Sequence, residues 1–480
     1  RCGIYTARSR TGWRQTAGKT NIKLLKEKRD TTYSRLKKFG IDSVGMQSGP
    51  ASASGQRSGR IPLREGGKLD RTSTDDLFVI YNYCRDLASV VGSDNMRYSE
   101  PFNEPDMDGG FTAWELAAAS KAAFLGFRDG DPKLKVLSSS FCLRAGAFHD
   151  TFLESGMKYY IDIFNIHNYW SIPGYKEYIQ LYRNAMKKYG LGDTALFVTE
   201  NGETAQAMKP GPKPREKLTW SSGDRCHSLE SEYAIAEWMA KTHFESIICG
   251  VDMNCIFFLW PILQKPMGDW GHFRSDSSTK PSLTVFANLA YYLAQGKWLG
   301  IYDPGKDMRG MLYAMPDGTQ TLVFWKKGDW DLTGKPSHYN VEKPTPVVLP
   351  LKIADGDYKQ VNMYGTPLPA AVVSGGKART EISTIPTYLL GLKGLTPQKA
   401  APARGKTCAA EDATVDKTIV LRLISGNNMK PDSTGAFARI EKGVGCIVEN
   451  LSPKCCRITR TGGCPRNKAC GHGGTLFYRP

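Results

Sequence analysis

The sequence predicts an α/β domain followed by an all-β domain. Strand-like and helix-like segments alternate at least six times before residue 300, and no hairpin signals separate them. Beyond residue 300 the pattern changes to short strand-like runs separated by turns such as Pro-Asp-Gly and Ser-Gly-Gly. Alternation without hairpins is typical of a parallel sheet with crossover helices, either closed into a barrel or open and doubly wound. Short runs with frequent turns are typical of a β-sandwich.

This pattern divides the 480 residues into four regions. A chain of this length is expected to hold two or three domains. We predict an α/β domain at 1–300, a β-sandwich at 301–395, a linker at 396–407 and a tail at 408–480. The tail is basic and Cys-rich, and a strand-like run at Thr418–Leu423 indicates that it could be a partial β module.

The first elements each have a local reason. A loose apolar face predicts a helix over Lys23–Lys38, which Gly40 ends. A short buried strand is predicted next, at Ile41–Met46, and residues 47–74 are rich in Gly, Ser and Arg, as in a loop. A helix with one apolar face then covers residues 75–91.

The later elements continue the alternation. Further helices are predicted over Trp114–Phe127, His149–Tyr159, Tyr175–Tyr189, Leu229–Phe244 and Pro281–Leu293. The strands among them are predicted at Met96–Glu100, Leu134–Ser138, Ile161–His167, Ala195–Glu200 and Cys255–Leu259. Runs of the all-β region are Met311–Ala314, Gln320–Trp325, Val347–Leu351, Tyr358–Tyr364 and Pro386–Leu390.

The net charge of +17 lies at the two ends of the chain. Residues 1–40 carry a net charge of +10 and residues 396–480 one of +8, whereas the 355 residues between them carry −1. A nucleic-acid-binding protein more often gathers its basic groups around its working surface. We therefore predict no nucleic-acid partner and interpret the basic ends as solvated.

Apolar runs and cysteines bear on membrane insertion and on the compartment of the protein. The longest apolar run, Cys255–Trp260, is far shorter than the roughly 18 residues that span a bilayer, so we predict no membrane insertion. Six of the 12 cysteines follow residue 395, and their spacing favours disulfides or thiols over a zinc site. The localisation stays open, with a secreted or periplasmic location favoured.

Two glutamates attract attention because each lies at the end of a predicted strand. Glu104 follows the strand at Met96–Glu100, and Glu200 closes the strand at Ala195–Glu200. In a (β/α)8 barrel the carboxyl ends of the strands meet at one mouth. Hydrolysis of a glycosidic bond needs two carboxyl groups, one to protonate the leaving oxygen and one to attack the anomeric carbon. The alternative is that each glutamate is a structural carboxylate paired with Arg or Lys.

The segments around these glutamates resemble motifs of clan A glycoside hydrolases. Phe102–Asp106, which reads Phe-Asn-Glu-Pro-Asp, resembles the Asn-Glu-Pro motif that ends their strand four. Phe197–Gly202 resembles their strand-seven nucleophile segment, and the later β region resembles the sandwich of family 39. This family 39-like or family 5-like resemblance covers about residues 20–395. It implies a (β/α)8 TIM barrel followed by an all-β sandwich domain.

The resemblance also implies roles for individual residues. Glu104 is implied as the acid/base, Glu200 as the nucleophile, and Asn103 as the hydrogen-bond partner of the sugar 2-hydroxyl. His167 and Tyr169 fall where such enzymes often carry His and Tyr, at the end of strand six.

Aromatic residues of the same region are further candidates for sugar binding. Trp260 falls on the strand-eight segment, whose Trp typically floors the −1 subsite in the family, because sugar rings have apolar faces that stack on indole. Trp170 and Trp270 are weaker candidates. The alternative interpretation of Trp260 is a plain core residue, and that of His167 is a satisfied core histidine.

The start of the chain departs from the family pattern. Only about 100 residues precede Glu104, where a complete barrel needs three strands and three helices. Ile41–Met46 matches strand three, so Arg1–Thr20 must supply strand two, and strand one is missing. We therefore expect that either Arg1–Thr20 supplies a substitute edge strand or the barrel is N-terminally incomplete. An Arg or His from the first strands often helps to bind the sugar, and no residue can be assigned to this role from the sequence.

Taken together, these residues predict a retaining glycoside hydrolase that cleaves O-glycosidic bonds of oligo- or polysaccharides by double displacement. Its partner is a carbohydrate substrate, and it needs no metal or organic cofactor. The carboxyl groups of Glu104 and Glu200 should lie roughly 5–5.5 Å apart, and the charge of Glu200 should raise the pKa of Glu104. The alternative is a non-catalytic carbohydrate-binding or structural protein on a degenerate barrel. The sugar, the linkage, exo or endo cleavage and the oligomeric state stay open.

Overall fold

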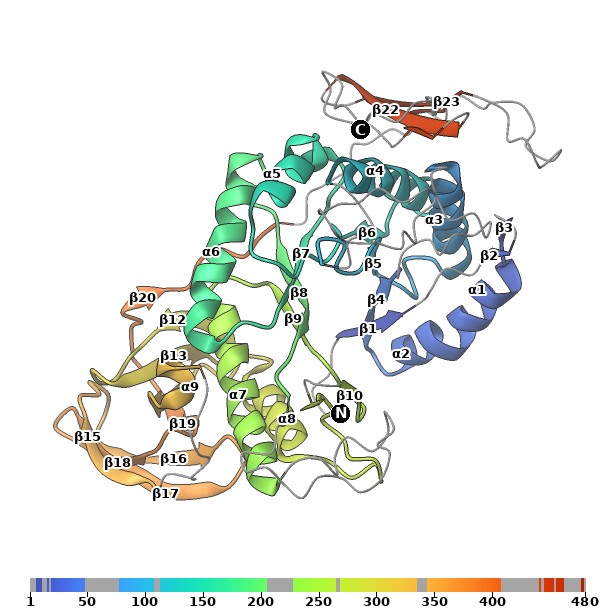
Figure 1. Cartoon of the computed structure of the whole chain (residues 1–480). Helices are drawn as coiled ribbons and strands as arrows, with labels where there is room; N and C mark the ends of the chain where they lie inside the picture. Colours follow the sequence, from blue (N-terminus) through green and yellow to red (C-terminus); the bar gives the residue numbers. More distant parts are fainter. Residues whose placement is uncertain are drawn as a thin grey trace. The chain divides into compact units, whose positions relative to one another are not determined.

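The computed structural model describes residues 6–10, 15–16, 19–47, 77–107, 113–204, 228–264, 268–334, 343–406, 440–441, 444–452, 455–461 and 476–478. They belong to two units, whose elements are labelled in Figure 1. The parallel-sheet unit comprises residues 5–167, 180–199 and 405–480. The antiparallel-sheet unit comprises residues 1–4, 168–179 and 200–404.

Parallel strands in the order of the sequence form the first unit. The first four of them, in the order β1-β4-β5-β6, are β1 (Thr6–Arg10), β4 (Asp42–Met46), β5 (Tyr98–Glu100) and β6 (Lys135–Val136). Parallel bridges from Leu137 to Ile163 and from Phe141 to Ile166 bring in β7 (Phe164–Asn168). Phe164 N–H then donates to the carbonyl of Ala195, directly before β8 (Leu196–Asn201). The predicted parallel α/β arrangement is therefore confirmed.

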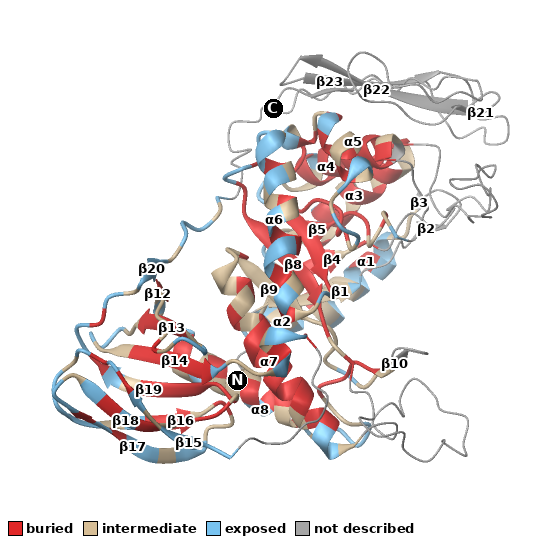
Figure 2. Ribbon diagram, turned by 60° about the vertical axis from the view of Figure 1, so that its left-hand side comes forward, coloured by how far each residue is buried: buried red, intermediate tan, exposed pale blue. Residues whose placement is uncertain are grey.

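The last two of these strands are buried along their whole length. Every residue of β7 and β8 is buried, and Figure 2 shows β8 in the colour of burial. Near-continuous burial is typical of a parallel sheet covered on both faces. The polar residues on these strands, Asn165, His167 and Thr199, must therefore find partners inside the protein.

Helices between the strands cover the sheet. In this unit they are α1 (Ile22–Lys28), a π-helical turn at Arg29–Tyr33, α2 (Ser34–Lys38), α3 (Leu77–Val91), α4 (Ala113–Gly130), α5 (Ala147–Glu154) and a 3₁₀ turn at Met157–Tyr159. Two glycines of α4 allow α3 to come close. A Cβ at Gly126 would lie 2.3 Å from the carbonyl oxygen of Tyr81, and one at Gly130 would lie 2.2 Å from that of Arg85.

The expectation that the first 20 residues supply a strand beside strand three is met. Thr6–Arg10 pairs in parallel with Asp42–Met46, and Arg8 lies opposite Val44. A short hairpin of β2 (Gln15–Thr16) and β3 (Lys19–Thr20) follows. Among the described residues of this unit no further parallel strand lies beside β1, so closure into an eight-stranded barrel stays a prediction.

The second unit is built on an antiparallel sheet of nine strands. Its order is β15-β18-β17-β16-β19-β14-β13-β12-β20. The strands are β12 (Lys297–Ile301), β13 (Met308–Ala314), β14 (Gln320–Lys326), β15 (Thr345–Leu349), β16 (Gly356–Asn362), β17 (Pro367–Ser374), β18 (Lys377–Ile382), β19 (Thr387–Leu392) and β20 (Lys399–Ala400). The pairing joins all of them in one sheet, so two separate sheets of a sandwich are not established.

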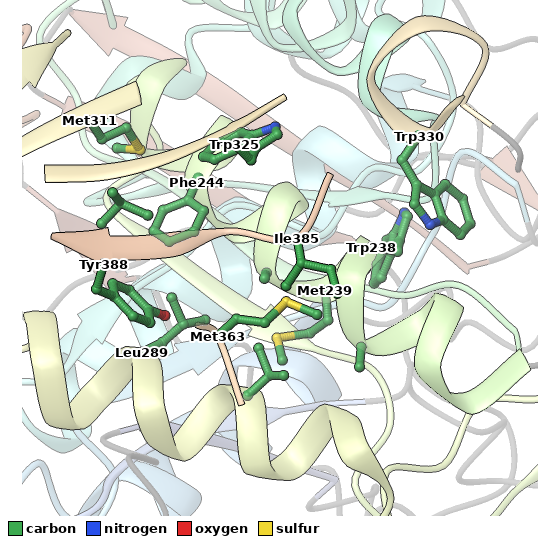
Figure 3. Close-up of a cluster of buried hydrophobic side chains, with 14 of the residues drawn as sticks. Trp238, Met239, Phe244, Leu289, Met311, Trp325, Trp330, Met363, Ile385 and Tyr388 are labelled. Atoms are coloured by element: carbon green, nitrogen blue, oxygen red, sulfur yellow. The ribbon is translucent and has the colours of Figure 1, made fainter. Parts of the chain in front are cut away.

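Alternate residues of the strands in this sheet pack into two apolar cores, one on each face. Met311, Val323 and Trp325 pack with Phe244 and Leu289 from two helices, as Figure 3 shows for part of this cluster. The intervening residues form the second core. It contains Leu312, Leu322, Phe324, Leu349, Val373, Ala378 and Leu389. Strands from both ends of the sheet contribute to this second core, so the sheet folds over it.

The helices that cover the first core are α7 (Leu229–Ile248) and α8 (Pro281–Leu293). The remaining elements are α6 (Ile172–Lys188), which runs from one unit into the other, α9 (Asp329–Leu332), β9 (Met253–Ile256) and a hairpin of β10 (Leu263–Gln264) and β11 (Gly268–Asp269). The helices of the described ranges include none long and apolar enough to cross a membrane.

The tail contains a small antiparallel sheet. Its order is β21-β22-β23-β24, with β21 (Ile440–Glu441), β22 (Val444–Ser452), β23 (Cys455–Thr461) and β24 (Leu476–Tyr478). The predicted strand at Thr418–Leu423 and the side chains of the tail cysteines lie outside the described residues. The proposed borders at residues 300, 395 and 407 stay predictions.

Candidate active site

Glu104 stands on the turn that follows β5. Its φ angle is +43°, in the left-handed region that side chains other than glycine rarely adopt. Glu104 N–H donates to the carbonyl of Ser140 at 3.0 Å, and Asn103 forms a parallel bridge with the same residue. The turn after β5 is thus held against the segment that extends β6. Residues held in sparsely populated backbone regions cluster at functional sites.

His167, on β7, contacts the carboxyl group of Glu104. The distance from Nδ1 of His167 to Oε1 of Glu104 is 2.7 Å. The imidazole is completely buried, and 12% of the Glu104 side chain is exposed. The structure therefore brings together two of the residues that the sequence singled out, and it places an imidazole within hydrogen-bond distance of the carboxyl group.

The surroundings of Glu104 favour its protonated form. Burial, the largest cause, raises the pKa of Glu104 from 4.5 to about 7. The charge of Arg8 acts in the opposite direction, while the charges of Asp106 and Glu100 raise the pKa further. A carboxyl group with a pKa near 7 can both donate and accept a proton at neutral pH. We expected the charge of Glu200 to raise this pKa; burial comes first instead, and the contribution of Glu200 stays a prediction.

A buried carboxylate, Glu100, links four strands beneath this turn. Its two oxygens accept hydrogen bonds from Arg8 on β1 at 2.5 and 3.0 Å. Ser140 donates at 2.8 Å, Asn165 at 2.9 Å and Thr199 at 3.1 Å. Burial raises the pKa of Glu100, but the charge and hydrogen bond of Arg8 lower it more, so its pKa lies below the ordinary value. This network gives partners to Asn165 on β7 and Thr199 on β8.

Arg8 is a residue that the sequence did not identify. Its Nη2 atom donates to Oδ1 of Asn103 at 2.6 Å, and 9% of its side chain is exposed. It therefore fixes the amide of Asn103, the residue expected to bind the sugar 2-hydroxyl. Arg8 lies between Ala7 and Ser9 in a segment with no apolar alternation, and no motif marked it.

Glu200 lies in the antiparallel-sheet unit, at the end of β8. The Tyr169 hydroxyl donates a short hydrogen bond to its Oε2 atom. The Tyr169 ring meets the indole of Trp270 edge to face, with centroids 5.3 Å apart, and meets Phe257 at 6.4 Å. Glu200 is buried at 9% exposure. The carboxylate predicted as nucleophile thus accepts a hydrogen bond from a phenol whose ring is held by two further aromatic rings.

The tryptophan candidates differ in exposure. Trp260 is 53% exposed and stacks on Phe273 with ring centroids 5.1 Å apart, so it is not a core residue. Trp270, by contrast, is 7% exposed and packs on Phe257 and Tyr169. Trp170 is 39% exposed beside Tyr178. An open indole such as that of Trp260 can offer a flat apolar face to a ligand.

The candidate residues therefore form two groups. Glu104, His167 and Asn103 belong to the parallel-sheet unit, and Glu200, Tyr169 and Trp260 belong to the antiparallel-sheet unit. The separation between the carboxyl groups of Glu104 and Glu200 stays a prediction.

Comparisons with known proteins point to one class of fold. No family model matches the sequence, and no curated protein matches it. The structure is similar to that of a family 39 glycoside hydrolase from the gut symbiont Bacteroides cellulosilyticus WH2, with a TM-score of 0.58 and 15% identity over 82% of this chain and 76% of that one. It is similar to a glucosidase from Croceicoccus marinus, with a TM-score of 0.52 and 14% identity over 81% and 89%. A family 44 endoglucanase from Clostridium acetobutylium gives a TM-score of 0.50 and 11% identity over 81% and 94%.

Identity this low shows the fold alone. The chain has the fold of clan A glycoside hydrolases, and the resemblance that its motifs indicated is confirmed at this level. Family 39 is among the families that share the fold.

Proposed function

We propose that this protein is a retaining glycoside hydrolase in which Glu104 is the acid/base and Glu200 the nucleophile. The observation that carries the proposal is the environment of Glu104, a buried carboxyl group with a pKa of about 7 that contacts His167 at 2.7 Å. A general acid must keep its proton near neutral pH and release it as the bond breaks. The glycoside hydrolase fold supports the same assignment.

In the first step a carboxylate oxygen of Glu200 attacks the anomeric carbon, and the glycosidic C–O bond breaks. The leaving oxygen takes the proton of Glu104, and a glycosyl ester forms on Glu200. In the second step Glu104 accepts a proton from water, the water oxygen attacks the anomeric carbon, and the ester bond to Glu200 breaks. Both carboxyl groups then return to their starting states.

The neighbours of the two glutamates have roles that follow from their contacts. His167 can donate to the Glu104 carboxylate once its proton has left, which stabilises the ionised form. Tyr169 donates to Glu200 and orients the oxygen that attacks. Arg8 holds the amide of Asn103, which is proposed to bind the sugar 2-hydroxyl. Trp260 offers its open face to a sugar ring.

The proposed mechanism requires the carboxyl groups of Glu104 and Glu200 to flank one glycosidic bond. A carboxyl separation of roughly 5–5.5 Å is expected for a retaining enzyme.

Mechanism-based trapping tests this proposal. A 2-fluoro glycoside with a good leaving group should acylate Glu200 and stop at the ester, because fluorine slows the second step more than the first. Peptide mapping across a panel of such glycosides should find the label on the peptide containing Glu200 and identify the sugar. A label on another carboxylate would refute the assignment of Glu200. No label and no hydrolysis with any sugar would favour the alternative, a non-catalytic carbohydrate-binding protein.

A further inference from the structure

The residues behind Glu104 form a network that the proposed mechanism does not use. Asp106 lies two residues after Glu104, and 1% of its side chain is exposed. Its carboxylate accepts hydrogen bonds from the backbone N–H groups of Cys142 at 3.1 Å and Leu143 at 2.8 Å. It also contacts Nε2 of His149 on α5 at 3.1 Å. A buried carboxylate with three donors is held in a single place.

These bonds hold the loop that carries Glu104 against the loop at Ser140–Leu143. Glu104 N–H donates to the Ser140 carbonyl, and two residues further on Asp106 accepts from Cys142 and Leu143. The segment Glu104–Asp106 is therefore fastened to Ser140–Leu143 at both of its ends. Hydrogen bonds at both ends of the segment stabilise the left-handed backbone conformation of Glu104, which persists only where the surroundings determine it.

His149 fastens Asp106 from the far side. Gly146 N–H donates to Nδ1 of His149 at 3.2 Å, so Nε2 carries the hydrogen that is donated to Asp106. The Tyr182 hydroxyl lies 3.1 Å from the same Nε2 atom and donates to the carbonyl of Leu143 at 2.5 Å. The imidazole is 3% exposed, so this arrangement lies inside the protein.

We propose that Asp106 is a positioning residue for the acid/base, which fixes the turn that carries Glu104 and supplies a permanent negative charge beside it. His149 holds Asp106 in that place. The proposal rests on the proposed function, because it assigns the control of the acid/base to a residue that does not touch the substrate. Asp106 would act on the acid/base in two ways, through the position of the Glu104 carboxyl group and through the charge near it.

The charges around Glu104 support the electrostatic half of this proposal. Burial raises the pKa of Asp106, but hydrogen bonds from His149 and Leu143 lower it more, so Asp106 is ionised at neutral pH. Its charge raises the pKa of Glu104. Other groups that act on Glu104 include Arg8 from β1, Glu100 from β5 and His167 from β7. Those that contact Asp106 include His149 from α5 and Cys142.

Two substitutions separate charge from position. Asp106→Asn keeps the size of the side chain and removes its charge, whereas Asp106→Glu keeps the charge and changes the reach. For Asp106→Asn we expect the basic limb of the kcat/KM profile to move to lower pH by about 0.5–1 unit. For Asp106→Glu we expect that limb to stay in place while kcat/KM falls about 10- to 100-fold, since a displacement of about 1 Å can cost that much.

A second readout is the ratio of activities on substrates with different leaving groups. A purely structural role of Asp106 would not change this ratio. An aryl glycoside with a strongly activated leaving group needs little help from a general acid, whereas an alkyl glycoside needs full protonation. Both variants should therefore lose more activity on the alkyl glycoside than on the activated one. Asp162→Asn is the matched control, because Asp162 is an equally buried carboxylate, paired with Arg128 directly before β7. It should lower the thermal unfolding midpoint and leave both readouts at their wild-type values.

An NMR titration keeps this inference separate from the proposed function. The ¹³Cδ signal of Glu104, identified by its loss in Glu104→Gln, should titrate near 7 in the wild-type chain and at lower pH in Asp106→Asn. A wild-type chain that hydrolyses no glycoside overturns the proposed function, and the titration still decides the electrostatic inference. An unchanged titration and an unchanged leaving-group ratio in Asp106→Asn would overturn the inference in an active enzyme. If Asp106→Asn does not fold, His149→Gln, which loosens Asp106 but retains its carboxylate, should still change the leaving-group ratio.

Discussion

The surroundings of Glu104 and Glu200 differ in how they prepare a carboxyl group. Glu104 lies on a left-handed turn among charged groups, with Arg8, Glu100 and Asp106 acting on its pKa. Glu200 lies near the end of a buried strand and accepts a hydrogen bond from the Tyr169 hydroxyl, whose ring packs on Trp270. The first arrangement suits a group that must change its protonation state, and the second suits a group that must stay in one orientation. In the proposed function, the two carboxyl groups therefore receive different tasks from their neighbours.

The largest effect on activity should come from removing the carboxylate of Glu200. Glu200→Gln should lower kcat/KM by about 10⁴- to 10⁶-fold, because the amide cannot form the glycosyl ester. Initial rates on an aryl glycoside, measured on a variant that retains its thermal unfolding midpoint, provide the check. Glu203→Gln, in the same segment, is the matched control and should keep activity within about twofold. Residual activity of a tenth or more in Glu200→Gln would rule out its role as nucleophile.

The raised pKa of Glu104 should make the stability of the protein depend on pH. A carboxyl group with a raised pKa binds its proton more tightly in the folded chain than in the unfolded one, so the folded state loses stability as pH rises from 4.5 towards 7. Glu104→Gln removes this loss. The variant should therefore be more stable than the wild type by up to about 3 kcal/mol at pH 8 and equally stable below about pH 4.5.

Urea unfolding at a series of pH values measures this difference. Glu104→Gln should also abolish most hydrolysis of alkyl glycosides, so that one substitution raises stability and removes activity. Such a trade-off is expected where a protein holds a group in an unfavourable environment for function. A stability difference that does not depend on pH would contradict the raised pKa of Glu104.

Removing the phenol beside Glu200 should have a smaller effect. Tyr169→Phe retains the ring that packs on Trp270 and removes the donor to the carboxylate. A hydrogen bond to a charged group contributes about 1.5–3 kcal/mol, so kcat should fall roughly 10- to 100-fold. Tyr175→Phe is the matched control, since the hydroxyl of Tyr175 contacts Ser246 in a buried position, and it should affect stability rather than kcat. Equal kcat values for the two variants would show that the Tyr169 contact has no part in the reaction.

The same comparison explains what the sequence could and could not predict. The alternation of strands and helices located Glu104 and Glu200 at strand ends, since local patterns and short motifs are enough for this. It did not find Arg8, because Thr6–Arg10 has no apolar alternation and forms a strand through its pairing with β4. It did not find the link between Asp106 and His149, which are 43 residues apart, or the partners of Glu100, which lie up to 99 residues away. Such contacts depend on the packing of distant loops, and a single sequence contains no local signal for them.

The closure of the barrel and the division of the β region were the least predictable parts. The turns after residue 300 indicate antiparallel strands, and among the described residues nine antiparallel strands pair in one sheet from Lys297 onwards. Whether they form one sheet or two depends on which edges pair, and β19 pairs with both β14 and β16 to join the two halves. Turn signals report where strands end, but they do not report which strand lies beside which.

The smallest effect should come from the open indole of Trp260. Its ring is 53% exposed and stacks on Phe273, so removing it leaves the core intact. If this face carries a sugar ring, Trp260→Ala should raise KM about 5- to 10-fold and change kcat by less than about twofold, because aromatic stacking contributes about 0.5–1.5 kcal/mol. Trp260→Phe should restore most of the affinity. Tyr291→Ala, which removes an aromatic side chain that is 81% exposed on α8, is the matched control and should leave KM unchanged. A KM that rises equally in both alanine variants would mean that Trp260 contributes general surface rather than a sugar subsite, and the aromatic surroundings of Glu200 would then serve the nucleophile alone.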